Sequence, residues 1–120
     1  MRPVDRILDV SRFTPAAHRG ASREFPENTI PAFARALEIL PDCVLETDVR
    51  CSADGVPVLR HDRLLEETTD GTGETGSLTW DELRRLDAGY GISFDRGRTF
   101  PFRGKEFRLC TLDQALERFP

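Results

Sequence analysis

The chain has 120 residues, of which 38% are hydrophobic and 32% charged, and this ordinary composition fits one soluble globular domain. No apolar run approaches the roughly 20 residues that a membrane-spanning helix needs, which excludes a transmembrane segment. The net charge of −4 argues against a surface that binds nucleic acid. The three cysteines are odd in number and lack metal-type spacing, so neither a disulfide framework nor a zinc site is expected.

The first ten residues do not predict a signal peptide. Residues 1–10 alternate charged and apolar side chains, a pattern that a short amphipathic helix can accommodate. They lack the apolar core of a signal peptide. Together with the free thiols, which suit a reducing compartment, this favours a cytoplasmic protein.

The first half of the chain predicts a strand, a helix and a second strand. The apolar run over 13–17 is the first strand, and a polar loop follows it. Asn28 or Thr29 can cap a helix over 30–40, whose apolar residues recur every three or four positions. The alternating, β-branched segment 43–51 is the second strand. Such a βαβ unit implies parallel strands and a right-handed crossover.

Two capping boxes predict the helices of the second half. Thr79 with Glu82 begins a helix that ends near residue 89, and Thr111 with Gln114 begins a last helix over 112–119. The segment 90–108 between them is aromatic, glycine-rich and basic, and it has no clear period.

A pair of acidic residues lies in the second predicted strand. Glu46 and Asp48 are two residues apart, so their carboxylates share one face with Val44 and Arg50. Two adjacent like charges repel each other unless a cation compensates them, and oxygen ligands suit Mg²⁺ or Ca²⁺. The alternative is an exposed sheet face with two solvated acids.

His61 follows a predicted hairpin whose turn contains Asp54-Gly55. A two-residue turn places Asp48 opposite His61, and a four-residue turn places Glu46 there instead. Either register brings the imidazole to a carboxylate, where it suits acid–base chemistry near neutral pH. A three-residue turn would reverse the face and break this arrangement. The alternative is a surface histidine in a polar loop.

His18 and Arg19 follow the first predicted strand. Ligands of parallel α/β folds gather at the carboxyl ends of strands, where these two residues can meet Glu46 and Asp48. The fork-shaped guanidinium of Arg19 suits a phosphate group. Each residue alone is better explained as a solvated group at the end of a strand, so the hypothesis depends on their convergence.

The run Gly71–Gly76 (GTGETG) matches the dinucleotide-binding pattern G-x-G-x-x-G. No convincing strand precedes it, and the next predicted helix begins later, at Thr79. A flexible turn is therefore the better interpretation.

Taken in order, these motifs resemble the glycerophosphodiester phosphodiesterase family. The resemblance extends from about residue 15 to the end of the chain, and in combination the motifs are highly specific. They are His18-Arg19-Gly20, Pro26-Glu27-Asn28-Thr29, Glu46-x-Asp48, Asp54-Gly55-x-Pro57-Val58, His61-Asp62, Thr68-Thr69, Gly71-x-Gly73, Leu83-x-x-Leu86-Asp87-x-Gly89 and Thr111-Leu112.

The resemblance implies an α/β fold of the TIM-barrel type, with residues 1–120 as the N-terminal part of one domain and an insertion at about 64–108. It implies metal-dependent hydrolysis of glycerophosphodiesters, which are deacylated phospholipids, to glycerol 3-phosphate and an alcohol. The expected cofactor is a divalent cation, Mg²⁺ or Ca²⁺, and the expected partner is this small-molecule substrate.

The same resemblance assigns the site residues. Glu46 and Asp48 match the metal ligands, His18 and His61 match the acid–base pair without showing which is the acid, and Arg19 matches a phosphate-binding arginine. Glu27 and Asn28 are expected to shape the loop and cap the helix rather than to take part in chemistry.

The chain departs from the family pattern in its length, because it stops before a further acidic ligand on the next barrel strand. A TIM barrel needs roughly 200 residues or more, so the sequence is expected to be part of a longer protein. Three alternatives remain: a metal- or phosphodiester-binding module without catalysis, a related lyase of the sphingomyelinase D type, and a structural fragment.

Overall fold

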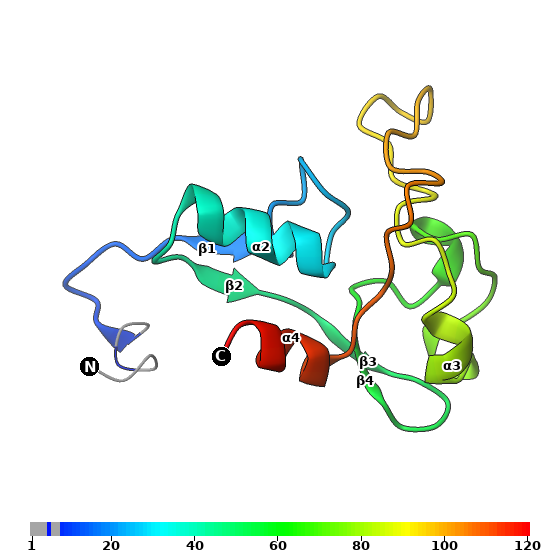
Figure 1. Cartoon of the computed structure of the whole chain (residues 1–120), viewed down its shortest axis with the longest axis horizontal. Helices are drawn as coiled ribbons and strands as arrows, with labels where there is room; N and C mark the ends of the chain where they lie inside the picture. The colour runs from blue at the N-terminus through cyan, green and yellow to red at the C-terminus, as the bar shows by residue number, and fades with distance from the viewer. Residues whose placement is uncertain (1–4, 6–7) are drawn as a thin grey trace.

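The computed structural model describes residue 5 and residues 8–120, so most of the helix expected at residues 1–10 lies outside the described residues. Figure 1 shows a helix above a pair of strands on one side of the molecule and a loop-rich lobe on the other. Within the described residues, none of the helices has the length and apolar character needed to cross a bilayer.

The predicted βαβ unit is confirmed. Strand β1 (Ala16–His18) pairs in parallel with β2 (Val44–Glu46), and helix α2 (Ile30–Ile39) connects them and lies over both (Figure 1). Thr29, rather than Asn28, caps α2, because its side chain accepts a hydrogen bond from the backbone N–H of Ala32. The first strand begins later than predicted, since Phe13 is 89% exposed and belongs to no strand.

The predicted single strand over 43–51 is wrong, because the chain leaves the first sheet after Glu46. Residues 47 and 48 separate β2 from β3 (Val49–Cys51), which pairs antiparallel with β4 (Pro57–Leu59) in a second two-stranded sheet. Because residues 47 and 48 are not part of a regular strand, their side chains need not alternate between the two faces of a sheet. They can therefore face the end of β1.

The hairpin register differs from both predicted registers. Val49 lies opposite Leu59, and the backbone N–H of Ser52 donates to the carbonyl of Val56, which leaves a three-residue turn over 53–55. Neither Asp48 nor Glu46 is therefore the cross-strand partner of His61. The backbone N–H of Arg60 instead donates to the carbonyl of Asp48 at 2.9 Å.

Strand β4 joins two hydrophobic cores, because its alternate side chains point to opposite faces. Leu59 packs with Phe33 of α2 and with Cys110. Val58 packs with buried residues of the 64–108 segment and its neighbours, namely Leu65, Leu83, Ala88 and Leu109. Helix α4 (Leu112–Arg118) covers the first core, where Phe119 meets Phe33 edge to face.

Both predicted capping boxes are confirmed, at Thr79 with Glu82 and at Thr111 with Gln114. Helix α3 (Trp80–Leu83) is much shorter than predicted, because the chain turns at 84–89 to bury Ala88 in the second core. The rest of the 64–108 segment consists of turns and two short 3₁₀ helices, η1 (Leu65–Glu67) and η2 (Thr75–Ser77). The GTGETG run forms a turn that leads into η2, which begins at Thr75.

Candidate active site

The candidate site lies where β1 and β2 end side by side. His18 is the register partner of Glu46, and Arg19 follows with a left-handed backbone (φ 60°). The backbone N–H of Arg19 donates to both the carbonyl and the carboxylate Oε2 of Glu46, at 3.0 and 3.1 Å. A non-glycine residue in this conformation is strained, so the surrounding contacts must hold it. The predicted meeting of His18, Arg19 and Glu46 is confirmed.

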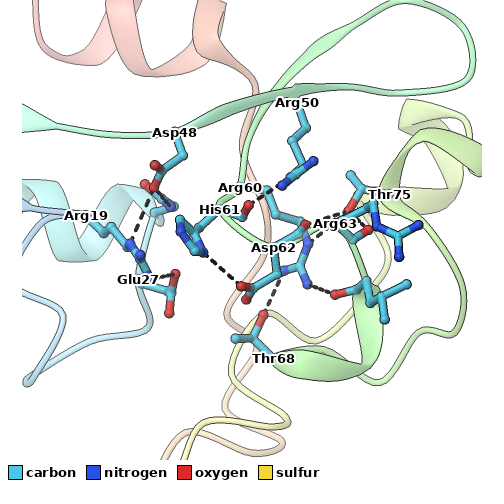
Figure 2. A network of polar contacts seen from close by, with 12 residues as sticks. Arg19, Glu27, Asp48, Arg50, Arg60, His61, Asp62, Arg63, Thr68 and Thr75 are labelled. Atoms are coloured by element: carbon cyan, nitrogen blue, oxygen red, sulfur yellow. Dashed lines mark hydrogen bonds and ion pairs between the residues drawn. The ribbon is translucent and has the colours of Figure 1, made fainter.

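The guanidinium of Arg19 is the centre of an acidic cluster (Figure 2). Its Nη1 lies 3.0 Å from Glu27 Oε2, and its Nε lies 3.4 Å from Asp48 Oδ2. The Nε group is buried and makes no hydrogen bond of good geometry within the described part of the chain. Glu46 and Asp48 thus both contact Arg19, the first at its backbone N–H and the second at its side chain, although the strand predicted to carry both acids is broken between them.

Asn28 supports this cluster from the start of α2. It is 2% exposed and has a left-handed backbone (φ 57°), which asparagine tolerates better than most residues. Its Nδ2 donates to Asp48 Oδ2 at 3.3 Å, and its Oδ1 accepts from Thr47 Oγ1 at 2.7 Å. Its backbone N–H donates to the Arg19 carbonyl. Asn28 therefore links the two strained turns and orients Asp48.

Glu27 and Asn28 were expected only to shape the loop, yet both contact site residues. The signal available in the sequence was the Pro26–Thr29 motif that contains them. Their partners lie at 19, 47 and 48, and these contacts depend on how α2 packs against the strands.

His61 lies just after β4, on the side of Arg19 and Asp48 in the view of Figure 2. Its Nδ1 is 2.8 Å from Asp62 Oδ1, and its carbonyl accepts a hydrogen bond from Arg50 Nε at 2.8 Å. The carboxylate partner of the imidazole is thus its neighbour in sequence rather than Glu46 or Asp48. The side chain of His61 is about half exposed.

Arg60, which the sequence analysis did not single out, anchors the segment that carries His61. Its side chain is almost fully buried and donates to Thr68 Oγ1, Thr75 Oγ1 and the carbonyl of Leu64 at 2.7, 3.1 and 2.6 Å (Figure 2). Burial lowers the pKa of this guanidinium, although arginine stays protonated at neutral pH. The hydrogen bonds connect β4 to the 64–77 turns across the residues that follow His61.

The carboxylate oxygens of the candidate site suit a hard divalent cation in their chemistry. Mg²⁺ is commonly held by one or two carboxylates, with water and substrate phosphate as further ligands, and Glu46 and Asp48 would supply those carboxylates. Among residue 5 and residues 8–120, no group of three or more histidine, cysteine, aspartate or glutamate side chains is arranged to hold a metal ion.

Similar proteins were found by sequence and by structure. A glycerophosphodiester phosphodiesterase of Caldanaerobacter subterraneus is 47% identical over 95 residues, which are 78% of this chain and 38% of that protein. A glycerophosphoryl diester phosphodiesterase domain from Mycobacterium tuberculosis superposes with a TM-score of 0.78 at 35% identity, over 90% of this chain and 41% of that one.

A phosphodiesterase of Oleispira antarctica, solved in complex with the product sn-glycerol-3-phosphate, superposes with a TM-score of 0.72 at 35% identity, over 88% of this chain and 39% of that one. The chain thus spans about two fifths of each of these relatives. The solved relatives are TIM-barrel-type enzymes, which confirms the expected fold class, while the described residues form two small sheets and no closed barrel.

The sequence model of the glycerophosphoryl diester phosphodiesterase family matches residues 18–120, from the site histidine His18 onward. This range contains every residue of the candidate site described above, and the chain belongs to that family.

Proposed function

We propose that the protein hydrolyses glycerophosphodiesters to glycerol 3-phosphate and an alcohol, with a divalent cation as cofactor and with deacylated phospholipids as substrates. The observation that carries the proposal is the pairing of Arg19 with Glu27 and Asp48 beside His18, in a chain that matches the family from His18 onward. A relative with bound sn-glycerol-3-phosphate supports the same product.

Arg19 is proposed to bind the phosphodiester. Its planar fork presents several N–H donors that match phosphate oxygens, and one of them, the buried Nε, has no well-formed hydrogen bond among the described residues. A cation held by Glu46 and Asp48 would supply Lewis-acid polarisation of the phosphoryl oxygen. Asn28 would keep the Asp48 carboxylate oriented toward that position.

His18 and His61 are proposed as the acid–base pair. When the Nδ1–H of His61 donates to Asp62, the Nε2 of the same ring is left as the nitrogen that exchanges a proton with the substrate. His18 lies at the end of β1 next to the phosphate-binding guanidinium. One imidazole takes the proton of the nucleophile, which is water or a substrate hydroxyl, and the other gives a proton to the leaving alkoxide. If a substrate hydroxyl attacks first, water then opens the cyclic phosphodiester to give glycerol 3-phosphate.

The test uses His18→Ala and His61→Ala in the protein at its native length. Release of glycerol 3-phosphate from a panel of glycerophosphodiesters, followed by ³¹P NMR, is expected to fall about 10²- to 10⁴-fold in each variant. Calorimetric binding of the diester should be retained, which separates lost chemistry from lost folding. Undiminished hydrolysis in both variants would overturn the acid–base assignment.

A metal- or phosphodiester-binding module without turnover is the second candidate, because the contacts of Arg19 with Glu46 and Asp48 describe a binding site whether or not turnover follows. It predicts that the native-length protein binds the cation and the diester but releases no glycerol 3-phosphate.

A further inference from the structure

A cavity of about 290 Å³ connects the candidate site to the 64–108 segment. Three of its lining residues, His18, Arg19 and Glu27, belong to the site. The opposite wall comes from residues 91–94, and Arg23 of the turn after β1 also lines it. A phosphodiester bound at Arg19 would therefore extend one of its two ester substituents into this cavity.

The position of the predicted cation ligands indicates which substituent that is. Neither Glu46 nor Asp48 is among the described residues that line the cavity. The residues that would hold the cation and supply its Lewis-acid chemistry therefore lie outside the cavity. The wall with Arg23 and Phe94 is left for the alcohol that leaves.

The wall of the cavity carries a cation–π pair. The guanidinium carbon of Arg23 lies 5.3 Å from the centroid of the Phe94 ring, within the range of a favourable cation–π contact. Phe94 is 44% exposed, yet its ring is held edge to face against the largely buried Phe102 at 5.9 Å. Arg23 thus covers a fixed aromatic face, which is the kind of surface that binds a quaternary ammonium group.

The charge of Arg23 is not neutralised by an ion pair. Within the part of the chain that the structure describes, Arg23 contacts no carboxylate, whereas Glu27 is paired with Arg19. Glu67 is the remaining acidic residue of the wall, and it is exposed to solvent. A cationic head group in the cavity would displace Arg23 from the ring and meet a like charge. A hydroxyl-bearing alcohol would instead accept hydrogen bonds from the guanidinium of Arg23.

We infer that Arg23 and Phe94 determine the specificity of the enzyme for the leaving alcohol, favouring uncharged polyols such as glycerol over the cationic head groups choline and ethanolamine. The inference rests on the proposed function and deepens it. Both residues are specificity determinants rather than catalytic residues, because they lie in the wall of the cavity beyond the reacting phosphate.

The experiment compares kcat/KM for glycerophosphoglycerol and glycerophosphocholine in the native-length protein and in Arg23→Gln. Glutamine keeps part of the side-chain length and removes the charge. We expect the ratio of the two kcat/KM values to change about fivefold in favour of glycerophosphocholine. This is the size of effect that one cation–π or like-charge contact has at a partly exposed site. Arg98→Gln is the matched control, since it removes an equal charge from an exposed residue outside the cavity. Adding Phe94→Leu to Arg23→Gln should cancel the gain, because the ring that receives the ammonium is then absent.

An unchanged ratio in Arg23→Gln, or an equal change in Arg98→Gln, would overturn the inference while leaving the proposed function intact. If the native-length protein neither binds nor hydrolyses any of the diesters, the proposed function fails and the inference fails with it. Calorimetric binding of both diesters to each variant separates these two outcomes.

Discussion

Replacing the buried Arg60 with alanine is expected to destabilise the fold by about 3 kcal/mol. A hydrogen bond to a charged group contributes about 1.5–3 kcal/mol, and Arg60 makes three. The loss is smaller than their sum, because Thr75 Oγ1 also contacts the carbonyls of Asp62 and Arg63 and because the burial cost of the guanidinium disappears. Most of the remaining loss of stability comes from the Leu64 carbonyl, which loses its hydrogen-bond donor, and from the cavity that the missing side chain leaves.

The measurement is urea or thermal unfolding of the native-length protein, in which about 3 kcal/mol corresponds to a fall in Tm of about 6–12 °C. Arg60→Met, which retains the apolar stem and fills most of the space, should lose less than Arg60→Ala. Arg85→Ala is the exposed control and should change stability by no more than about 0.5 kcal/mol. A loss in Arg60→Ala equal to that of the control would refute the view that this network holds the segment after His61.

Three further predictions concern a thiol pair, a turn carboxylate and a glycine. Burial raises the pKa of the Cys110 thiol to about 12, so Ellman's reagent at pH 8 should label the exposed Cys51 quickly and Cys110 only after unfolding; rapid labelling of both in the folded protein would contradict this. Hydrogen bonds from Thr99 and Ser93 lower the pKa of Asp95 from 3.8 to about 2, so its ionised form stabilises the turn above pH 3.8, and this contribution is lost as the pH falls through 2. Asp95→Asn should therefore be less stable than the parent at pH 7 and as stable as the parent near pH 2. A difference in stability that stays constant between pH 7 and pH 2 would refute this role of the Asp95 carboxylate. Gly20→Ala should cost at least about 1–3 kcal/mol in thermal unfolding, because Gly20 has φ 82° and an added Cβ would lie 2.7 Å from the backbone carbon of Ala32; an unchanged Tm would show that this turn can relax.

The local features of the chain were predictable because their causes lie within a few residues. The capping boxes at Thr79 and Thr111 join a hydroxyl to a backbone N–H three residues later, and both helices begin there. The βαβ unit follows from the change between strand-like and helix-like spacing of apolar residues. The meeting of His18 and Arg19 with Glu46 follows from that unit, since parallel strands carry their carboxyl ends to the same edge.

The hairpin register is held by contacts inside the turn and by contacts with a distant segment. Inside the turn, the N–H groups of Gly55 and Val56 donate to the carbonyl and the hydroxyl of Ser52. Across the fold, Ala53 N–H donates to the Leu78 carbonyl and the Asp54 carboxylate accepts from Trp80 N–H, about 25 positions away. A shift of one residue reverses every side chain, which is why the partner of His61 became Asp62 instead of a strand carboxylate.

By itself, the sequence determined the order of the elements, the caps and the convergence of charged residues at one sheet edge, because each of these follows from spacing along the chain. The tertiary structure alone decided that Arg60 is buried, that Glu27 and Asn28 join the Arg19 cluster, and that Arg23 lies over Phe94. Burial and pairing of polar groups depend on which distant segments pack together. The sequence does not distinguish a charged side chain that faces water from one that is buried among hydrogen-bond acceptors.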